Sequence, residues 1–255
     1  MRLDVQNITH RYDDLAVLND ISFTVERGDV VALIGPSGCG KSTLLSILGG
    51  LLQPSDGTVF LSGAKPEGCL NPLTYVFQDF ALLPWRSVEG NLSFALEGHK
   101  LSKAQKAERI EEALTLTGLA EFRKAYPKQL SGGMRQRVGI ARALSVRPAV
   151  LLMDEPLSAL DAQTRTILLD EFTDLFARNG ITAVYVTHNL NEAVHLANKV
   201  VALSRRPGVI KDIVTIDIPL AERGKRSPEL LAIEERLWSL IRDEALVADR
   251  ELENA

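Results

Sequence analysis

The sequence predicts an α/β protein with a mainly parallel sheet, antiparallel strands at the N-terminal end and an inserted helical subdomain. Two unbroken apolar runs, Val30–Ile34 and Val150–Met153, have the length of strands that are buried on both faces. Helical patterns alternate with such runs along the chain, which favours strand–helix–strand units. Residues 88–147 are more helical than the rest, and this stretch is expected to form the insertion.

The N-terminal residues predict short strands joined by turns. Leu3–Val5 and Ile21–Val25 alternate between apolar and polar residues with a period of two. The turn Glu26–Asp29 then leads into the first buried strand. A glycine-rich loop and the helix Lys41–Leu48 follow, and Gly49 ends that helix.

Capping signals mark the helices of the insertion. Ser102 begins a capping box before an apolar-periodic helix, and Gly118 ends that helix as a C′ glycine. Ser131 begins a further helix that runs to about Val146. The next expected elements are a helix at Thr164–Arg178, a strand at Ile181–Val186, a helix at Leu190–Asn198 and a strand at Val200–Ser204.

The tail from residue 206 predicts an amphipathic helix near residues 228–243. One face of this helix carries Leu230, Ile233, Leu237, Trp238 and Ile241. We expect this face to pack on the chain's own domain, and a contact between two copies is the alternative.

Composition limits the classes of function. The chain has 255 residues, and 29 Lys and Arg against 33 Asp and Glu give a net charge of −4, which does not favour a nucleic-acid partner. Two cysteines suit a reducing compartment rather than a secreted disulfide scaffold. No apolar run approaches the roughly 20 residues of a spanning helix, and the N-terminus lacks the apolar core of a signal peptide. We therefore expect a cytosolic chain whose membrane role would be that of a peripheral partner.

A glycine-rich loop between a predicted strand and a predicted helix has the pattern G-x-x-x-x-G-K-[ST]. Its backbone N–H groups can surround a polyphosphate, and the helix N-terminus adds partial positive charge. Lys41 would bind the β- and γ-phosphates, and the Ser42 hydroxyl would bind Mg²⁺. The candidate nucleotide-binding residues of this loop are Gly35, Pro36, Ser37, Gly38, Cys39, Gly40, Lys41, Ser42 and Thr43. Because Cys39 lies inside this loop, thiol reagents are expected to block nucleotide binding.

Two carboxylates follow the second buried strand. In a nucleotide hydrolase, Asp154 at the strand end would reach the Mg²⁺, and Glu155 would polarise a water near the γ-phosphate. An Asp at a strand end is often only a turn residue or a cap. The phosphate loop earlier in the chain favours the catalytic interpretation.

A second anion site is predicted where a helix begins with small residues, at Leu130–Gly133. Ser131 is a candidate N-cap, and the two glycines leave first-turn N–H groups open. An ordinary capped helix is the alternative. Because one loop already holds the phosphates, this site would serve the nucleotide of another subunit.

These motifs, in this order, resemble those of the ATP-binding cassette (ABC) ATPases over about residues 1–205. The resemblance implies a P-loop NTPase fold, ATP hydrolysis, and a C-terminal extension, residues 206–255, that belongs to the same domain. Gly35–Thr43 matches the Walker A motif, Val150–Asp154 matches Walker B, and Leu130–Gly133 matches the signature motif. Met134 departs from the family, which favours Gln there.

The resemblance also implies roles for single residues, which the sequence alone would leave as ordinary surface or core positions. Tyr12 would stack on adenine, and Gln78, in the Q-loop, would sense Mg²⁺ and couple to the membrane partner. His188 would contact the γ-phosphate, and Asp161 belongs to the D-loop. The implied catalytic residues are Glu155, His188 and Gln78; the further nucleotide contacts are Tyr12, Ser131, Gly132, Gly133 and Asp161; the Mg²⁺ ligands are Ser42, Gln78 and Asp154.

Three segments resemble the nitrate/sulfonate/taurine branch of importers: Leu82–Arg86, Gly132–Arg137 and Ser204–Gly208. This implies an ATPase subunit at the cytoplasmic face of the membrane that powers uptake of a small solute. Its partners would be permease subunits, a second ATPase subunit in a homodimer, and, through the permease, a solute-binding protein. A soluble ABC ATPase that acts on DNA or ribosomes is the alternative. A single cassette and the acidic balance favour transport, and a GTPase's Asn-Lys-x-Asp motif is missing from the sequence.

Leu83, Pro84 and Trp85, just after Gln78, would form an apolar socket for a partner helix. Packing of Trp85 inside the helical insertion is the alternative.

Overall fold

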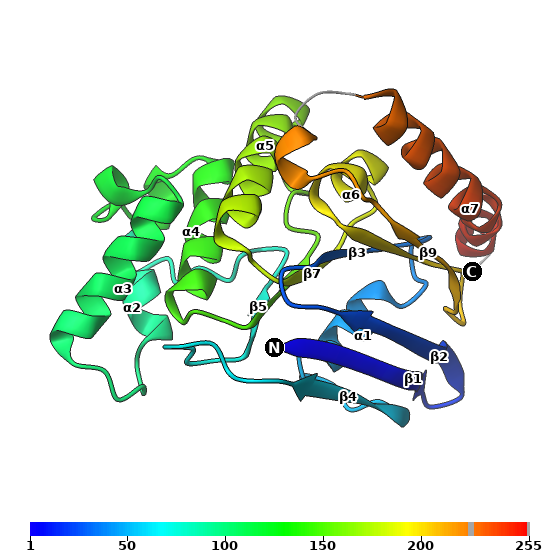
Figure 1. Cartoon of the computed structure of the whole chain (residues 1–255), viewed down its shortest axis with the longest axis horizontal. Coiled ribbons are helices and arrows are strands. Elements are labelled where there is room, and N and C mark those ends of the chain that lie inside the picture. Colours follow the sequence, from blue (N-terminus) through cyan, green and yellow to red (C-terminus); the bar gives the residue numbers. More distant parts are fainter. Residues whose placement is uncertain (224–226, 254–255) are drawn as a thin grey trace.

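The computed structural model describes residues 1–223 and 227–253, and a central six-stranded sheet organises it (Figure 1). The strand order is β5 (Leu73–Val76), β6 (Val150–Asp154), β7 (Ala183–Val186), β3 (Val30–Ile34), β8 (Lys199–Leu203) and β9 (Ile210–Thr215). The first five strands are parallel, and only β9 runs antiparallel, beside β8. The prediction of a mainly parallel sheet is therefore confirmed.

Both faces of this sheet are covered, as the unbroken apolar runs predict. On one face Val30, Ala32 and Ile34 of β3 pack with the helices α5 (Ala162–Asn179), α6 (Leu190–Leu196) and α7 (Pro228–Glu253). On the other face Val31 and Leu33 pack with α1 (Lys41–Leu48) and with a second sheet. All five residues of β3 are buried, which fixes the strand that leads into the phosphate loop.

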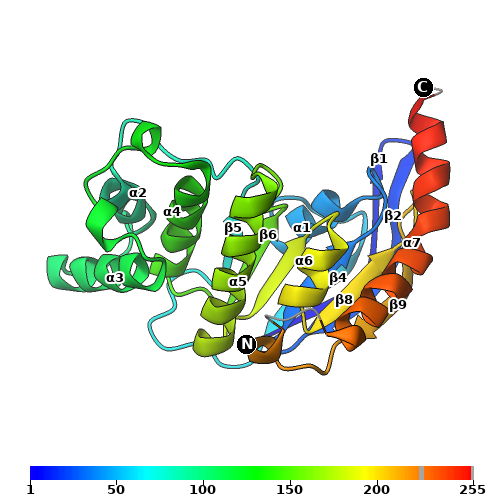
Figure 2. The same cartoon turned by 90° about the horizontal axis from the view of Figure 1, so that it is seen from above.

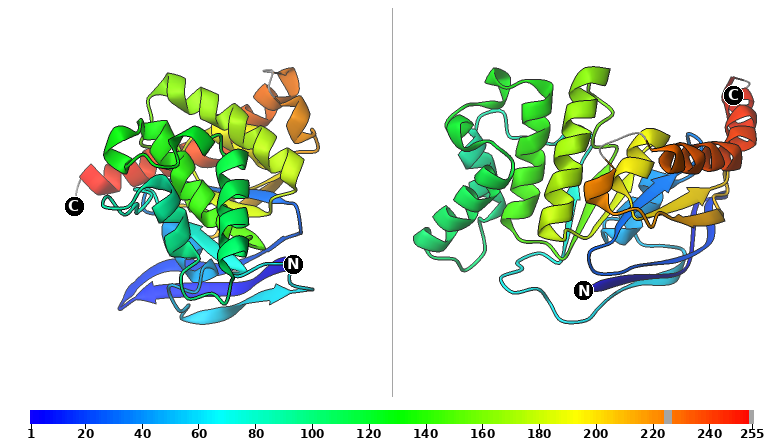
Figure 3. Two further views of the ribbon diagram at one scale, coloured as in Figure 1. Left: turned by 90° about the vertical axis from the view of Figure 1, so that its left-hand side faces the viewer. Right: turned by 45° about the horizontal axis from the view of Figure 1, so that its top comes forward.

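The second sheet is antiparallel, in the order β2 (Leu15–Val25), β1 (Arg2–Tyr12) and β4 (Asp56–Ser62). Figure 3 shows it below the central sheet. β1 and β2 each have eleven residues, so they are longer than predicted. The reason is a shift of register near Asn7 and Asp20, which adopt positive φ angles of 51° and 52° and share a side-chain hydrogen bond of 2.7 Å. These irregularities break the alternation that sequence analysis follows.

The helical insertion forms its own core at one end of the molecule (Figure 2). It contains α2 (Val88–Ala95), α3 (Lys103–Leu116) and α4 (Gly132–Ser145), with short 3₁₀ turns at Ala120–Phe122 and Pro127–Gln129. The capping box at Ser102 is confirmed, as are the left-handed Gly118 (φ 66°) after α3 and the Ser131 cap of α4.

The helix predicted near residues 228–243 extends further, to Glu253. The boundaries of α5 and α6 differ from the prediction because polar side chains have other partners. The Asp161 carboxylate accepts the Thr164 N–H at 2.9 Å, so α5 begins at Ala162. The Asn198 side chain accepts the Val30 N–H at 3.0 Å, so α6 ends at Leu196 and Asn198 lies beyond it.

The C-terminal segment continues the central sheet before it forms α7. β9 pairs with β8, a 3₁₀ turn follows at Leu220–Glu222, and α7 lies at the opposite end from the helical insertion (Figure 3). Leu230, Leu237 and Ile241 of α7 are buried against the core. Trp238 is 51% exposed, so its predicted place on the buried face is wrong. No helix within the described residues is both long and apolar enough to cross a membrane.

Buried Arg223 fixes this segment to α6. Its guanidinium donates to the carbonyl oxygens of Val194 and Ala197 at the end of α6, and to those of Ile216 and Ile218 beyond β9. The side chain is fully buried, and burial lowers its pKa.

Candidate functional site

The phosphate loop lies between the carboxyl end of β3 and the first turn of α1. Gly40 is the N-cap of α1, has a φ of 104°, and offers no side chain to cap the helix. A Cβ atom on Gly40 would lie 2.8 Å from Leu18 and 2.9 Å from Val17, so the position has no room for one. The first-turn N–H groups of α1 therefore remain open to an anion.

Lys41 lies inside this loop. Its Nζ atom donates to the carbonyl oxygens of Gly35 and Pro36, each at 2.8 Å, and the side chain is buried. Neither partner is a carboxylate, so the ammonium charge is available to a phosphate.

A hydroxyl and a carboxylate meet beside the loop. The Ser42 hydroxyl lies 3.0 Å from Asp154 Oδ1, and the Tyr75 hydroxyl of β5 lies 3.3 Å from Asp154 Oδ2. Burial raises the pKa of Asp154, while the hydrogen bonds from Ser42 and Tyr75 oppose that rise. A desolvated carboxylate and a hydroxyl are oxygen ligands of the kind Mg²⁺ prefers, so these residues fit the ion.

The described residues contain no group of three or more His, Cys, Asp or Glu that could hold a metal by itself. A Mg²⁺ ion here would complete its shell with phosphate oxygens and water, as this ion usually does.

Glu155 and His188 follow adjacent parallel strands. Glu155 has a φ of 44°, and its backbone N–H donates to the Val186 carbonyl at 3.1 Å. His188 Nδ1 lies 3.3 Å from Glu155 Oε2. The carboxyl ends of β6 and β7 thus bring together the two predicted catalytic residues.

A cavity of about 400 Å³ connects these groups with Tyr12, which the sequence places far from them. Tyr12 is half exposed and meets the His10 ring edge-on at 4.7 Å. The lining residues are Tyr12, Leu15, Val17, Ser37, Gly38, Gly40, Lys41, Ser42, Thr43, Glu155, His188 and Arg206. Arg206 lies in none of the predicted nucleotide-binding motifs, so the sequence does not predict its place in the site.

Other predicted residues do not line this cavity. Ser131 accepts the Met134 N–H at 3.2 Å, and the first turn of α4, with Gly132 and Gly133, belongs to the helical insertion. The Met134 side chain packs against the core of that insertion.

Gln78 and Asp161 also lie outside the cavity, at the two ends of the D-loop, Ser158–Asp161. Gln78 Nε2 donates to the Ser158 hydroxyl at 3.3 Å, and Asp161 is the N-cap of α5. Within one chain, the phosphate loop, the end of β6 and His188 therefore form one site. Ser131–Gly133, Gln78 and Asp161 lie apart from it.

The Cys39 thiol is only 1% exposed, and burial raises its pKa. A protonated, enclosed thiol reacts slowly. Cys39 in the folded protein is therefore not the accessible target that its place in the loop suggests.

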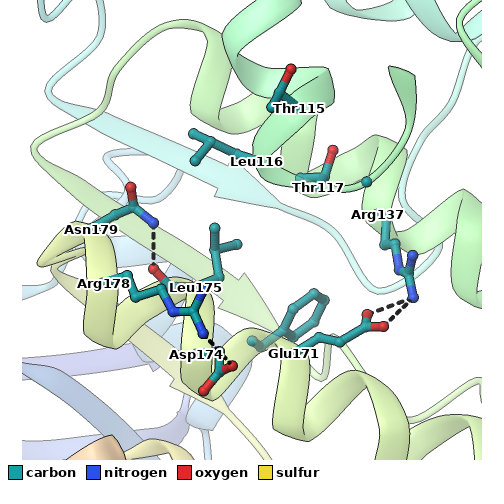
Figure 4. A pocket seen from close by; sticks show the side chains of 11 residues that line it. Thr115, Leu116, Thr117, Arg137, Glu171, Asp174, Leu175, Arg178 and Asn179 are labelled. Atoms are coloured by element: carbon teal, nitrogen blue, oxygen red, sulfur yellow. Dashed lines mark hydrogen bonds and ion pairs between the residues drawn. The ribbon is translucent and has the colours of Figure 1, made fainter. Parts of the chain in front are cut away.

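A second cavity, of about 450 Å³, lies between the end of α3 and α5 (Figure 4). The ion pair between Arg137 of α4 and Glu171 of α5, with a closest distance of 2.5 Å, links the helical insertion to the core at its edge. None of the phosphate-loop residues lines this cavity, so it is separate from the candidate nucleotide site.

A partly buried ionic cluster joins the D-loop to the segment that carries His188. The Arg165 guanidinium donates to the carbonyl oxygens of Leu160 at 2.8 Å and Leu157 at 3.3 Å. The same side chain lies 3.8 Å from the buried Glu192 carboxylate, which accepts the Thr187 hydroxyl at 2.7 Å. Burial raises the pKa of Glu192, and Thr187 and Arg165 oppose that rise.

Comparison with known families decides the identity of this arrangement. Residues 18–158 match the sequence profile of the ABC transporter family, and this span contains the Walker A, signature and Walker B motifs. The chain belongs to the ABC transporter ATPases. It is an ATP-binding subunit, and its ATP hydrolysis is coupled to transport.

Other ABC transporter ATP-binding proteins align with most of this chain. An uncharacterized ABC transporter ATP-binding protein of Methanocaldococcus jannaschii is 41% identical over 250 residues, 96% of this chain and 93% of the relative. The aliphatic sulfonates import ATP-binding protein SsuB of Bacillus licheniformis is 41% identical over 222 residues, 87% of this chain and 86% of SsuB. The putrescine transport ATP-binding protein PotG of Escherichia coli is 44% identical over 206 residues, 80% of this chain and 55% of PotG.

Solved structures of ABC cassettes share the fold. A dimeric cassette in a post-hydrolysis state, with ADP and phosphate bound, has a TM-score of 0.68 at 30% identity and covers 84% of this chain and 98% of its own. The CbiO1 subunit of Clostridium perfringens, part of a transporter complex, has a TM-score of 0.75 at 26% identity, with 91% and 98% coverage.

Proposed function

We propose that this ABC ATPase powers an importer for a small solute of the nitrate, sulfonate or taurine kind. It would act as a homodimer, peripherally at the cytoplasmic face of the membrane and bound to permease subunits. The solute-binding protein would reach it only through the permease. The similarity to SsuB over 87% of the chain supports the choice of importer and of solute class.

The observation that carries the permease contact is the exposure of Trp85. This side chain is 71% exposed, so it is not packed inside the helical insertion. The loop that carries it is nevertheless held by hydrogen bonds. The buried Asn91 accepts the Leu83 N–H at 2.8 Å and donates to the carbonyls of Leu83, Arg86 and Ser87. A fixed loop that presents a large aromatic side chain to water suits a protein contact.

Two copies of the chain would bind two ATP molecules between them. The signature residues Ser131–Gly133 do not line the cavity of their own chain, and the open first turn of α4 can accept an anion. The phosphate loop of one copy would therefore face Ser131–Gly133 of the other, with Asp161 close to the same interface.

Each residue of the site would then have a separate role in ATP binding or hydrolysis. Lys41 would exchange two carbonyl partners for the β- and γ-phosphates. Glu155 would orient the attacking water, and His188 would hold both Glu155 and the γ-phosphate. Tyr12 would stack on adenine at the cavity's rim.

Ser42 and Asp154 would hold Mg²⁺, and Gln78 would join them when the helical insertion moves. The bound Mg²⁺ would neutralise part of the negative charge on the phosphates. Asp154, whose pKa is raised by burial, would be favoured in its ionised form by that cation.

A pull-down from detergent-solubilised source membranes tests this function. The bait is Glu155→Gln with ATP, and the eluate is identified by mass spectrometry. Recovery of a multi-span permease supports the importer, whereas recovery of ribosomal or DNA-repair proteins without a permease favours the soluble alternative.

Trp85→Ala in the same background separates docking from ATP binding. We expect it to lose the permease while its ATP affinity, measured by calorimetry, stays unchanged. Full permease recovery with this variant would contradict the docking role of Trp85.

A further inference from the structure

The turn between β8 and β9 is held directly against the nucleotide cavity. The Gly208 N–H donates to the Val17 carbonyl at 2.8 Å, and the Gly208 carbonyl accepts the Asn19 N–H at 3.0 Å. Inside the turn, the Ser204 hydroxyl accepts the Val209 N–H at 3.0 Å. The turn is thus fixed both to β2 and within itself.

The same turn lies against the phosphate loop. A Cβ atom on Gly208 would be 2.4 Å from the Cys39 carbonyl oxygen, and one on Gly35 would be 2.9 Å from the Leu203 carbonyl oxygen. Backbone of the hairpin therefore lies next to backbone of the phosphate loop at two points. The backbone at the tip of this turn is therefore held beside the phosphate loop, so a long side chain there can reach a bound nucleotide.

Two consecutive arginines stand at this tip and have different surroundings. The Arg205 backbone N–H donates to the Glu244 carboxylate of α7 at 3.2 Å, and its Nε lies 3.7 Å from the same group. Arg206 lines the cavity with Lys41 and Gly38. Among the residues that the structure describes, none forms a hydrogen bond or an ion pair with the Arg206 side chain.

The cavity has two ends of different chemistry. Glu155 and His188 follow the carboxyl ends of β6 and β7, and Ser42, in the first turn of α1, is hydrogen-bonded to Asp154 at the end of β6. The γ-phosphate is expected beside these groups. Val17 lies on β2, in the strand to which Gly208 is hydrogen-bonded, and Tyr12 lies on β1 beside it. Arg206 reaches the cavity from this second side.

We propose that Arg206 binds the nucleotide at its α-phosphate, from the β2 side of the cavity. This inference rests on the proposed nucleotide site. A guanidinium suits the role because it stays charged and donates two parallel N–H groups to one phosphate. Arg206 would act in ground-state binding and would not distinguish ATP from ADP, because both carry the α-phosphate.

Calorimetric titration of the full-length protein with ADP tests this assignment. Arg206→Ala should weaken ADP binding roughly tenfold or more, the size expected for one charge-assisted contact. In the Glu155→Gln background, adding Arg206→Ala should weaken ATP binding by the same factor as it weakens ADP binding. Arg205→Ala is the matched control and should stay within about twofold of the wild type, since Arg205 does not line the cavity and its exposed ion pair with Glu244 contributes little.

Two further measurements separate charge from packing. Arg206→Gln keeps the length of the side chain and should lose as much affinity as Arg206→Ala, while Arg206→Lys should retain part of it. The affinity of the wild type for ADP should fall more steeply with added salt than that of Arg206→Gln, because a screened charge is removed.

Each outcome has one meaning. A wild type that does not bind ADP would overturn the proposed nucleotide site itself. Unchanged ADP affinity in Arg206→Ala, with a wild type that binds, would overturn only the role of Arg206. A loss for ATP without a loss for ADP would overturn its placement at the α-phosphate.

Discussion

Arg165 offers a quantitative test of how the D-loop and the segment that carries His188 are held together. Arg165→Ala removes the hydrogen bonds to the Leu160 and Leu157 carbonyls and the nearest cation of the buried Glu192. The D-loop would lose its hydrogen bonds to Arg165. The segment that carries His188 would lose its link to Arg165 through Glu192 and Thr187. We expect a loss of both stability and ATPase turnover.

The magnitude follows from these contacts. A hydrogen bond from a charged group contributes about 1.5–3 kcal/mol to stability. The contact to the Leu160 carbonyl, at 2.8 Å, has normal hydrogen-bond length and is expected to contribute within this range. The 3.3 Å contact is weaker, and the side chain is 28% exposed, which reduces the electrostatic part. Together with the uncompensated Glu192, we expect a decrease in unfolding free energy of about 2–4 kcal/mol.

Arg178→Ala is the matched control on the same helix. Arg178 pairs with Asp174 at 3.1 Å, but the two side chains are 79% and 63% exposed. Such a surface pair contributes about 0.5 kcal/mol or less. Urea unfolding without nucleotide, with the ATPase rate measured in parallel, should therefore separate the two variants clearly.

The pH dependence gives a second check. Arg165 lowers the pKa of Glu192, so its removal raises that pKa further above the unfolded value of 4.5. A folded state with the higher pKa binds protons first on acidification. The cost of the substitution is therefore largest above the folded-state pKa of Glu192 and shrinks as the pH falls through it. Equal shifts of the urea midpoint in Arg165→Ala and Arg178→Ala, or a cost that does not change with pH, would contradict this role of Arg165.

Three further predictions concern the nucleotide site. Glu155→Gln should retain ATP binding, lose most turnover and accumulate as a dimer in light scattering; a monomer at saturating ATP would contradict the shared site. Tyr75→Phe removes a hydrogen bond that lowers the pKa of Asp154, so the acid limb of the Mg²⁺-dependent ATPase profile should move to higher pH. An unmoved limb would argue against Asp154 as the metal ligand. Native Cys39 should react with a maleimide at least about tenfold more slowly than in urea, as followed by mass spectrometry, and equal rates would show that the loop opens.

The parts of the fold that the sequence predicted well are those with a local cause. Val30–Ile34 and Val150–Met153 are continuous apolar runs because their strands are covered on both faces. Ser102 and Ser131 begin helices through hydrogen bonds to N–H groups three residues ahead. These signals depend only on residues that are close in sequence, so they can be recognised without the rest of the fold.

The missing strands depend on partners elsewhere. The sequence does not predict β4, β5 and β9, because all three are edge strands and few of their residues are buried. Trp238 shares the helical period of the buried residues of α7, but the period alone does not show how wide the covered face is.

The same division holds for the site. The motif residues Lys41, Ser42 and Asp154 could be named from local patterns, and the fold brings them together. Arg206 and the pair of Arg165 with Glu192 could not, because their neighbours come from distant segments and no spacing in the sequence links them.

The buried Arg223 limits where this chain can be shortened. It supplies donors to carbonyl groups at the end of α6, which the helix itself leaves without partners. An expression fragment that stopped after the last nucleotide motif would leave those carbonyls buried and unpaired, and would also expose the edge of β8. Fragments intended for crystallisation or fusion should therefore extend past Arg223, and we expect fragments that end before it to be recovered mainly as aggregates.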